Sequence, residues 1–392
     1  MIALVGKIFD GEKIIDKGTV IIEGNNIIKV IEGVETPQGA QVINGDFIMP
    51  GLIDAHMHFF GVEEDNVLSW NIVNEIDVAI RSTRDMERLL RSGFTSVRDL
   101  GSKVATRLSY LQNKGEIIGP TVIASGYSLA ITGGDDDPKD LPLDIAQRLS
   151  YSFYCDSPYE CRKAVRMVIR QGAGVVKVYA SGAFSQGGRI LPGFSLDELK
   201  AIVDEAHRAG LKVASHAYGK EALMNSILAG VDTIEHGLGI DDEIASMIKE
   251  REICYIPTLA TYEIPFGQPN PERENLIRRH FTEDMKIAVA HGLKIAAGTD
   301  YVGSKKRAHG GNYREAVLLA RYMSNLEALK AITSTAAECL GLKAGYLKEG
   351  YKADVIVVKG NPLNNIEDLS PSNILYVIKD GRIFRGYGLY QD

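Results

Sequence analysis

The stretch Pro50-Gly51-Leu52-Ile53-Asp54-Ala55-His56-Met57-His58 joins a short apolar strand to two histidines spaced two residues apart. Side chains two positions apart in an extended strand project to the same side, so one metal ion could contact both imidazoles. An isolated His-x-His pair is equally compatible with a core histidine at His56 and an incidental one at His58. The spacing alone does not decide between these interpretations, so the decision depends on the other residues of the chain.

The sequence pattern changes at this stretch. Before it, short apolar segments separated by turn residues predict strands at residues 2–9, 18–23, 27–31 and 41–49. After it, short apolar strands alternate with helical patterns up to about residue 342, which is typical of βα units around a parallel sheet. Eight such strands are expected, at residues 52–56, 95–99, 121–125, 175–180, 212–216, 233–236, 254–258 and 294–298. This pattern predicts an α/β fold, a (β/α)8 TIM barrel with insertions.

Strand character returns near the C-terminus, at residues 353–358 and in a hairpin over residues 374–383 whose turn is Asp380-Gly381. We expect the two chain ends to build one small β-sandwich domain from residues 1–50 and 344–392, beside a barrel domain over residues 51–343. Inside the barrel, Ser195-Leu196-Asp197-Glu198 is a capping box that predicts a helix up to Gly210. The polar segment over residues 130–152 is expected to be a long loop beside the functional site.

The composition matches an ordinary soluble globular protein, with 45% hydrophobic and 24% charged residues. The 44 basic and 51 acidic side chains give a net charge of -7, which offers no basic stripe for a nucleic acid. Apolar runs are too short for a membrane span and the N-terminus lacks signal-peptide features, so we expect a cytoplasmic protein with no membrane partner. Four scattered cysteines are expected to be reduced and buried, without a disulfide framework or thiolate zinc site: Cys155, Cys161, Cys254 and Cys339.

Three further metal-binding side chains end three different predicted strands: His216, His236 and Asp300. In a parallel barrel the carboxyl ends of all strands meet at one face, where active sites form. Topology therefore places these residues beside His56 and His58. Imidazole and carboxylate ligands suit zinc or a similar divalent metal, so the set as a whole predicts a metal site.

Lys177 interrupts the apolar strand Val175-Val176-Lys177-Val178, where a charged ammonium is costly to bury. Three interpretations compete: an ion-paired structural lysine, a Schiff-base nucleophile, and a lysine whose amine has captured carbon dioxide as a carbamate. Beside four histidines and an aspartate, the carbamate fits best, because it converts a cation into an anionic oxygen ligand.

Together these residues resemble the amidohydrolase superfamily, specifically its binuclear branch. The resemblance covers nearly the whole chain, from the stretch over residues 50–58 to the closing Gly350-Tyr351-Lys352-Ala353-Asp354-Val355. It implies two divalent metal ions, for which we expect zinc, and a carbamate on Lys177 that bridges them together with a hydroxide. One metal would be held by His56, His58, Lys177 and Asp300, and the other by Lys177, His216 and His236.

Within the superfamily, several stretches look like the prolidase and carboxypeptidase-like amidohydrolases: Thr95-Ser96-Val97-Arg98-Asp99-Leu100-Gly101, Ile131-Thr132-Gly133-Gly134, His216-Ala217-Tyr218-Gly219 and His309-Gly310-Gly311-Asn312. Those relatives commonly carry a histidine after Thr-Gly-Gly, where this chain has Asp135. This departure puts the usual substrate handling in doubt. The related imidazolonepropionase-like branch normally uses one metal and no carbamate, so Lys177 argues against it.

The resemblance implies a metal-dependent hydrolase that cleaves the amide bond of a small substrate, for which we expect a dipeptide or an N-acyl amino acid. Asp300 and Lys177 are the expected catalytic residues, with Asp300 carrying a proton to the leaving nitrogen. One alternative is a hydrolase of a cyclic amide, lactone or amidine. A second alternative, from a different class, is a metal-free barrel that serves as an interaction scaffold. We further expect a homo-oligomer whose partner is the small-molecule or dipeptide substrate.

Tyr218 and His309 are the candidate substrate-binding residues. Tyr218 points to the same side of its strand as His216, so its hydroxyl could bind a substrate carboxylate or an oxyanion, or could pack under a loop. His309 could line the pocket or lie in a surface loop. Arg98 is expected in an internal ion pair and Arg189 in solvent. The run Asp135-Asp136-Asp137 would suit a basic substrate group, although such runs are usually solvated.

Overall fold

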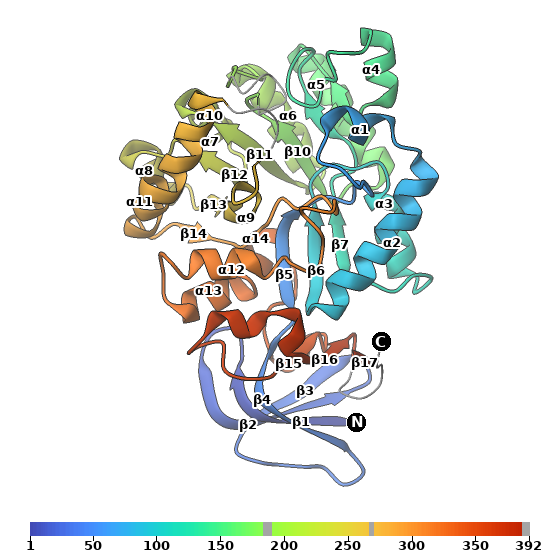
Figure 1. The fold of residues 1–392 in the computed structure, drawn as a ribbon, viewed down its shortest axis with the longest axis vertical. Coiled ribbons are helices and arrows are strands. Elements are labelled where there is room, and N and C mark those ends of the chain that lie inside the picture. The colour runs from blue at the N-terminus through green and yellow to red at the C-terminus, as the bar shows by residue number, and fades with distance from the viewer. Residues whose placement is uncertain (183–189, 266–269, 386–392) are drawn as a thin grey trace.

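The fold consists of a small β-sheet and a larger α/β part stacked on it (Figure 1). The structure is a computed structural model that describes residues 1–182, 190–265 and 270–385. In the larger part, helices flank the parallel strands on both sides, with α8 and α11 on one flank and α2 and α3 on the other. Within the described ranges, no helix combines the length and the apolar character that a membrane crossing requires.

Both ends of the chain contribute to the small sheet, as predicted. Its order is β17-β16-β15-β4-β1-β2-β3. The strands are β1 (Ile2–Phe9), β2 (Ile14–Glu23), β3 (Asn26–Glu32), β4 (Gln41–Pro50), β15 (Val355–Val358), β16 (Ile374–Lys379) and β17 (Arg382–Arg385). The seven strands form one continuous hydrogen-bonded sheet. Its edge strand β3 also contacts the segment before β15, because Ile27 N donates to Tyr351 O at 2.9 Å. The enclosed side chains, among them Leu4, Val20 and Val355, form a core of their own.

The larger part contains two parallel sheets, ordered β14-β13-β12-β11-β10-β8-β9 and β5-β6-β7. Backbone hydrogen bonds connect the two sheets, from Ala55 N in β5 to Ala297 O just after β14 at 2.9 Å, and from Gly174 N just before β10 to Ala124 O in β7 at 2.8 Å. Each of the eight predicted strands overlaps an observed one. These are β5 (Leu52–Met57), β6 (Phe94–Asp99), β7 (Thr121–Ala124), β10 (Val175–Tyr179), β11 (Lys212–Tyr218), β12 (Thr233–Leu238), β13 (Cys254–Ile256) and β14 (Lys294–Ile295).

The segment predicted as one long loop is more ordered than expected. It is bordered by two additional short strands, β8 (Ser128–Ala130) and β9 (Ser152–Tyr154), and contains helix α4 (Leu143–Leu149). The strands were missed because each has three residues, too few for a period of two to appear in the sequence.

Amphipathic helices cover the parallel strands. The predicted capping box is present at the start of α6, where the Ser195 and Glu198 side chains each meet the other's backbone, and Leu199 and Ile202 are buried. The helices are α1 (Val67–Ile72), α2 (Glu75–Arg91), α3 (Ala105–Asn113), α5 (Pro158–Gln171), α6 (Leu196–Arg208), α7 (Lys220–Ala229), α8 (Asp242–Glu250), α9 (Leu259–Tyr262), α10 (Pro271–Arg279), α11 (Met285–Ala290), α12 (Arg314–Leu319), α13 (Asn325–Ala331) and α14 (Ser334–Leu340).

One glycine connects the small sheet to the first parallel strand. Gly51 alone separates β4 from β5, and its N–H donates to Asp354 O at 3.0 Å. A Cβ at this position would lie 2.2 Å from the Thr95 side chain, so only glycine fits. The strand that carries His56 is therefore joined rigidly to the small sheet.

The cysteines are buried as predicted, but the expectation that they are reduced is wrong. Cys155 is bonded to Cys161, and Cys254 is bonded to Cys339. The second bond links β13 to α14 across 85 positions of sequence, with the two Cα atoms 5.9 Å apart. Spacing along the chain gave no signal of this pair because tertiary packing alone brings the two elements together.

Candidate active site

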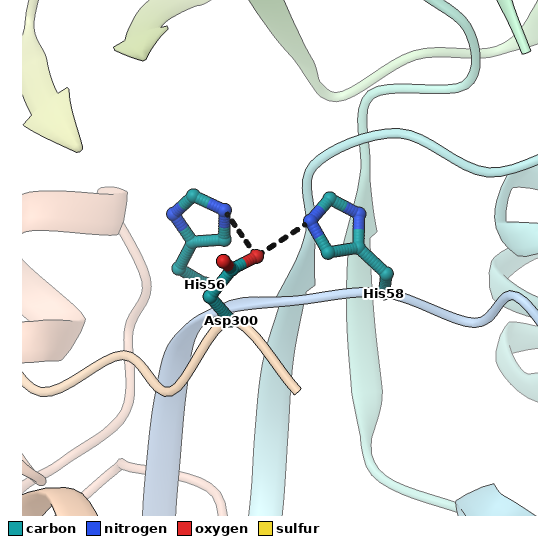
Figure 2. Close-up of side chains that lie close together, drawn as sticks. All are labelled: His56, His58 and Asp300. Atoms are coloured by element: carbon teal, nitrogen blue, oxygen red, sulfur yellow. Dashed lines mark hydrogen bonds and ion pairs between the residues drawn. The ribbon is translucent and has the colours of Figure 1, made fainter. Parts of the chain in front are cut away.

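Two histidines and an aspartate converge at the carboxyl end of β5 (Figure 2). Oδ1 of Asp300 lies 3.0 Å from His58 Nε2 and 3.4 Å from His56 Nε2. The ligand atoms of the three residues all lie within 4.8 Å of one another. His56 and His58 come from β5 and the residue after it, whereas Asp300 follows β14, so the arrangement matches the predicted meeting of strand ends.

Three histidines of the site use Nδ1 to contact a second protein group. His56 Nδ1 lies 2.8 Å from Glu235 Oε2, His58 Nδ1 lies 2.9 Å from Gly101 O, and His236 Nδ1 lies 2.7 Å from Thr258 Oγ1. A partner at Nδ1 fixes the orientation of the ring and leaves Nε2 as the metal-binding atom.

His216 and His236 stand beside this cluster with their rings 4.6 Å apart, and the His56 and His236 rings are 4.9 Å apart. Burial, reinforced by neighbouring positive groups, holds the pKa of both His216 and His236 well below the usual value, so both rings are neutral. Within the described part of the chain, the buried Nε2 atoms of His56 and His216 have no hydrogen-bond partner. Buried imidazole nitrogens without a protein partner are suited to bind a divalent metal, so the donor set fits one.

Lys177 is buried in the same region and its Nζ lies 4.8 Å from the centre of the Tyr179 ring. Burial lowers the pKa of the Lys177 amine, although the negative charges of Glu235, Asp300 and Asp136 act in the opposite direction. The Lys177 amine is therefore neutral at a lower pH than the amine of a lysine exposed to solvent.

A buried ion pair lies next to the histidines, and the sequence predicted only one of its two members. Arg98 was expected in an internal ion pair, and its guanidinium lies 2.7 Å from Glu235 Oε1. Glu235 was not singled out, although its place next to His236 was the available signal. Burial acts to raise the pKa of Glu235, but the charge of Arg98 and the hydrogen bond with His56 outweigh it and lower the pKa to about 2. The ionised carboxylate therefore remains available to hold His56.

Asp54 connects the two segments that supply the cluster, a role the sequence did not reveal. Its carboxylate accepts hydrogen bonds from His56 N at 3.0 Å, from Thr299 Oγ1 at 2.6 Å and from Asn312 Nδ2 at 2.7 Å. Burial raises the pKa of Asp54 despite these donors. By tying β5 to the segment that contains Asp300, Asp54 fixes the separation of the metal-binding groups.

A cavity of about 420 Å³ opens above these residues. Its lining includes His58, Lys177, His216, His236 and Asp300, with aromatic side chains from Phe60, Trp70, Tyr151, Tyr179, Tyr218 and Tyr262. Arg273, Arg278 and Arg307 also line it, as do Asp135 and Asp136.

The sequence-based candidates for substrate binding separate in the structure. Tyr218 lines the cavity and its hydroxyl lies 2.8 Å from that of Tyr262. His309 is buried and its Nε2 lies 3.0 Å from the carbonyl oxygen of His58, and it is not among the residues that line the cavity. Its position supports the backbone of His58, a candidate metal ligand. Arg189 lies outside the described residues.

The acidic run after Thr-Gly-Gly is buried, so the expectation that it is solvated is wrong. Asp136 accepts hydrogen bonds from Tyr151 Oη at 2.6 Å and Ser152 Oγ at 2.9 Å. Asp137 accepts one from the Gly133 N–H at 2.7 Å. Burial raises the pKa of Asp136. These contacts order the segment over the cavity, and the short strand β9 that supplies Ser152 was the element missing from the sequence-based picture.

Comparison with known proteins gives consistent matches over this chain. The model of the Amidohydrolase family matches residues 47–384. Ochratoxinase from Aspergillus niger is 34% identical over 379 residues, which cover 87% of this chain and 76% of that protein. Its crystal structure has a TM-score of 0.90 at 30% identity, covering 99% of this chain and 96% of that one.

Two further solved structures are similar over almost the full length. A prolidase complexed with N-methylphosphonate-L-proline is 30% identical, with a TM-score of 0.87 and coverage of 98% of this chain and 100% of that one. A Xaa-Pro dipeptidase with bound methionine is 31% identical, with a TM-score of 0.87 and coverage of 98% and 99%.

Proposed function

Given that the chain belongs to the amidohydrolase family, we propose that it is a metal-dependent hydrolase of a small amide, either a dipeptide or an N-acyl amino acid. The observation that carries this proposal is the convergence of two oriented imidazoles on the Asp300 carboxylate at the base of a cavity that two further histidines line. Such a site provides what amide hydrolysis needs: a place for metal ions, a carboxylate beside them and room for a small substrate.

The proposed site holds two zinc ions. His56, His58 and Asp300 would bind one ion and His216 and His236 the other, with a carbamate on Lys177 shared between them. Bound zinc supplies a water of lowered pKa as the nucleophile and a positive charge that polarises the carbonyl. The lowered pKa of buried Lys177 supports the carbamate, because only a neutral amine can react with carbon dioxide.

Asp300 is the proposed proton carrier. Burial alone would raise the pKa of its carboxyl, but the close contacts with His56 and His58 outweigh burial and hold that pKa well below the usual value. An ionised carboxylate can take a proton from the attacking water and give it to the nitrogen of the leaving amine. With Lys177 as a shared ligand, these are the two catalytic residues that we propose.

The substrate assignment rests on the cavity and on the relatives. The aromatic side chains of the lining suit a substrate with an apolar group, and Tyr218 contributes a hydroxyl to the same wall. The prolidase and the Xaa-Pro dipeptidase, by their names, favour a dipeptide. A cyclic amide or lactone is the alternative substrate, and the metal-free scaffold is the alternative without catalysis. His309 would affect substrate binding indirectly, by holding the backbone of His58 in place.

The test is a hydrolysis screen of zinc-loaded protein against dipeptides, N-acetyl amino acids, lactones and hydantoins. We expect release of a free amine from a dipeptide or N-acetyl amino acid, and loss of that activity when a chelator removes zinc. Turnover of lactones alone would move the assignment to the alternative substrate. A folded protein that binds no stoichiometric metal would instead favour the metal-free scaffold.

The remaining architectural expectations stand as part of the proposal. The two parallel sheets would form the (β/α)8 barrel of residues 51–343, which the backbone hydrogen bonds between the two sheets support. The small sheet from residues 1–50 and 344–392 would be the β-sandwich domain, folded over on itself. The homo-oligomer and the cytoplasmic location stay predictions.

A further inference from the structure

A helix beside the cavity contains one turn with an extra residue. Ile277 of α10 lines the cavity, and α10 continues into α11 through a single π turn, η2 (His280–Asp284). In this turn the N–H of Met285 bonds to the carbonyl oxygen five residues earlier, and the Phe281 carbonyl accepts a hydrogen bond from Tyr322 Oη at 2.6 Å. Single π turns inside α-helices occur frequently at functional sites, so the residues of this turn are candidates for a role in the chemistry.

Two buried side chains of the π turn bond to the backbone of two neighbouring loops. Nε2 of His280 lies 3.0 Å from the carbonyl oxygen of Pro257, which can only accept, so this nitrogen is the donor. Oδ2 of Asp284 accepts a hydrogen bond from the Gly239 N–H at 2.8 Å. Pro257 follows β13 and Gly239 follows β12, so one helical turn holds the backbone at the carboxyl ends of both strands.

The backbone that these contacts hold is strained at two positions. His236 has φ 68 and Thr258 has φ 51, in the left-handed region that residues other than glycine rarely adopt. Asp284 binds the chain three residues after His236, and His280 binds it immediately before Thr258. Strained conformations persist where the surrounding structure imposes them, and the π turn is part of that structure here.

Thr258 is held from both sides and in turn contacts His236. His280 bonds to the residue before it, and the Glu315 carboxylate accepts hydrogen bonds from the two N–H groups after it, at 2.9 and 2.7 Å. Oγ1 of Thr258 lies 2.7 Å from Nδ1 of His236. The orientation of the His236 ring therefore depends on the position of Thr258.

We infer that His280 and Asp284 are positioning residues for the second zinc ion of the proposed site. His236, which lines the cavity, would bind that ion through Nε2, because Nδ1 faces Thr258. Asp284 holds the chain that follows His236, and His280 holds Thr258, which orients the His236 ring. The inference rests on the proposed function, because it needs zinc on His236.

The first zinc ion would not depend on the π turn. His56 and His58 lie on β5 or next to it, and they are oriented by Glu235 and by the Gly101 carbonyl. Glu235 lies inside β12, where pairing with both neighbouring strands holds it in place. Loss of the contacts of the π turn should therefore weaken the second ion selectively, which general damage to the fold would not do.

The experiment compares Asp284→Ala, Asp284→Asn, His280→Leu and His280→Gln in the full-length protein. Stepwise competition with chromophoric chelators measures the two zinc affinities. Asp284→Ala removes the acceptor for Gly239 and His280→Leu removes the donor for Pro257. In both, the affinity for the second ion should fall roughly 10- to 100-fold while that for the first stays within about twofold. Asp284→Asn and His280→Gln keep an oxygen and an N–H in place and should restore most of the second affinity.

Three further variants serve as references. His236→Ala identifies the second ion, because it should leave one zinc ion per chain. Asp10→Ala removes a buried carboxylate that accepts from two backbone N–H groups after β1, in the small sheet. Lys212→Met removes a donor to the Cys339 carbonyl at the start of β11, the end of that strand opposite the site. Both of these controls should bind two ions like the wild type.

A milder variant keeps the test decisive if Asp284→Ala or His280→Leu does not fold. Tyr322→Phe removes only the hydroxyl that bonds to the Phe281 carbonyl, so it loosens the π turn from its half-buried side. It should lower the affinity for the second ion roughly two- to tenfold and leave the first unchanged.

Three results would overturn the inference: equal losses for both ions, an unchanged affinity for the second ion, or no recovery in Asp284→Asn and His280→Gln. A wild-type protein that binds fewer than two zinc ions, or that loses none in His236→Ala, would instead overturn the proposed function, and the inference with it.

Discussion

Oε2 of Glu235 lies 2.8 Å from Nδ1 of His56, which is 179 positions away in the chain. The contact fixes the His56 ring with its Nε2 3.4 Å from Asp300. Because Arg98 binds the other carboxylate oxygen, Glu235 stays ionised and increases the basicity of the imidazole. A residue that touches no substrate thereby controls how strongly the first metal would be held.

Replacing Glu235 by glutamine should weaken zinc binding roughly 10- to 100-fold, because His56 would lose a charged partner while keeping a neutral one. Chelator competition on the purified variant measures this effect. Glu283→Gln, at an exposed carboxylate that pairs with Arg279, is the matched control and should bind zinc like the wild type. Unchanged affinity in Glu235→Gln would mean that His56 is not a ligand held in this way.

Asp300→Asn should remove most of the turnover while the protein remains folded. An amide cannot cycle a proton, and a general acid-base group contributes roughly 100- to 10,000-fold in rate. Steady-state kinetics on zinc-loaded protein, with circular dichroism to confirm the fold, gives the comparison. Activity within a few-fold of the wild type would exclude Asp300 from proton transfer.

The two disulfides should differ in their contribution to stability. Cys254–Cys339 closes a loop of 85 residues and Cys155–Cys161 closes one of 6. By the chain-entropy relation, the longer loop contributes about 4 to 5 kcal/mol to the free energy of unfolding and the shorter one about 2 kcal/mol. Urea unfolding of Cys254→Ser and Cys155→Ser should show this order, and equal losses would argue against it.

Glu315 should make stability fall with rising pH. Burial raises its pKa to about 8 in the folded protein, against the ordinary 4.5. Between these two values the folded state holds a proton that the unfolded state has released, so the free energy of unfolding decreases as pH rises, by at most about 1.4 kcal/mol per pH unit. Above the folded-state pKa the loss is complete.

The measurement is urea unfolding at several pH values between 5 and 8.5, for the wild type and Glu315→Gln. Glutamine keeps the size and an acceptor for one backbone N–H but cannot ionise. The difference in stability between the two proteins should therefore shift in favour of glutamine as pH rises. Parallel curves would show that Glu315 does not titrate in this range.

The order of the strands was predictable because each parallel strand is a short apolar run with its own turn signals. Residues 52–56 and 212–216, for example, lie inside observed strands β5 and β11. That both chain ends contribute to one small β domain could also be anticipated, because strand patterns occur at both ends, but the pairing of β4 with β15 could not. The three-residue strands and the disulfide between Cys254 and Cys339 depend on contacts between distant segments, for which one sequence carries no periodic signal.

The candidate ligand set could be proposed from the sequence because metal chemistry needs particular side chains at strand ends. The groups that orient these side chains were harder to find. Asp54 and Thr258 are ordinary residue types whose roles depend on three-dimensional contacts, such as the one between Thr258 and His236. The buried state of Asp136 depends on Tyr151 and Ser152, which the long-loop expectation had left without structure.

The single-residue connection at Gly51 also determines how the protein can come apart. With no flexible linker between β4 and β5, and with Gly51 N bonded to Asp354 O, the small sheet cannot detach without pulling on the strand that carries His56. We therefore expect loss of the small sheet and loss of the candidate site to be one cooperative event and not two successive ones. The terminal sheet would then limit how long the candidate site persists.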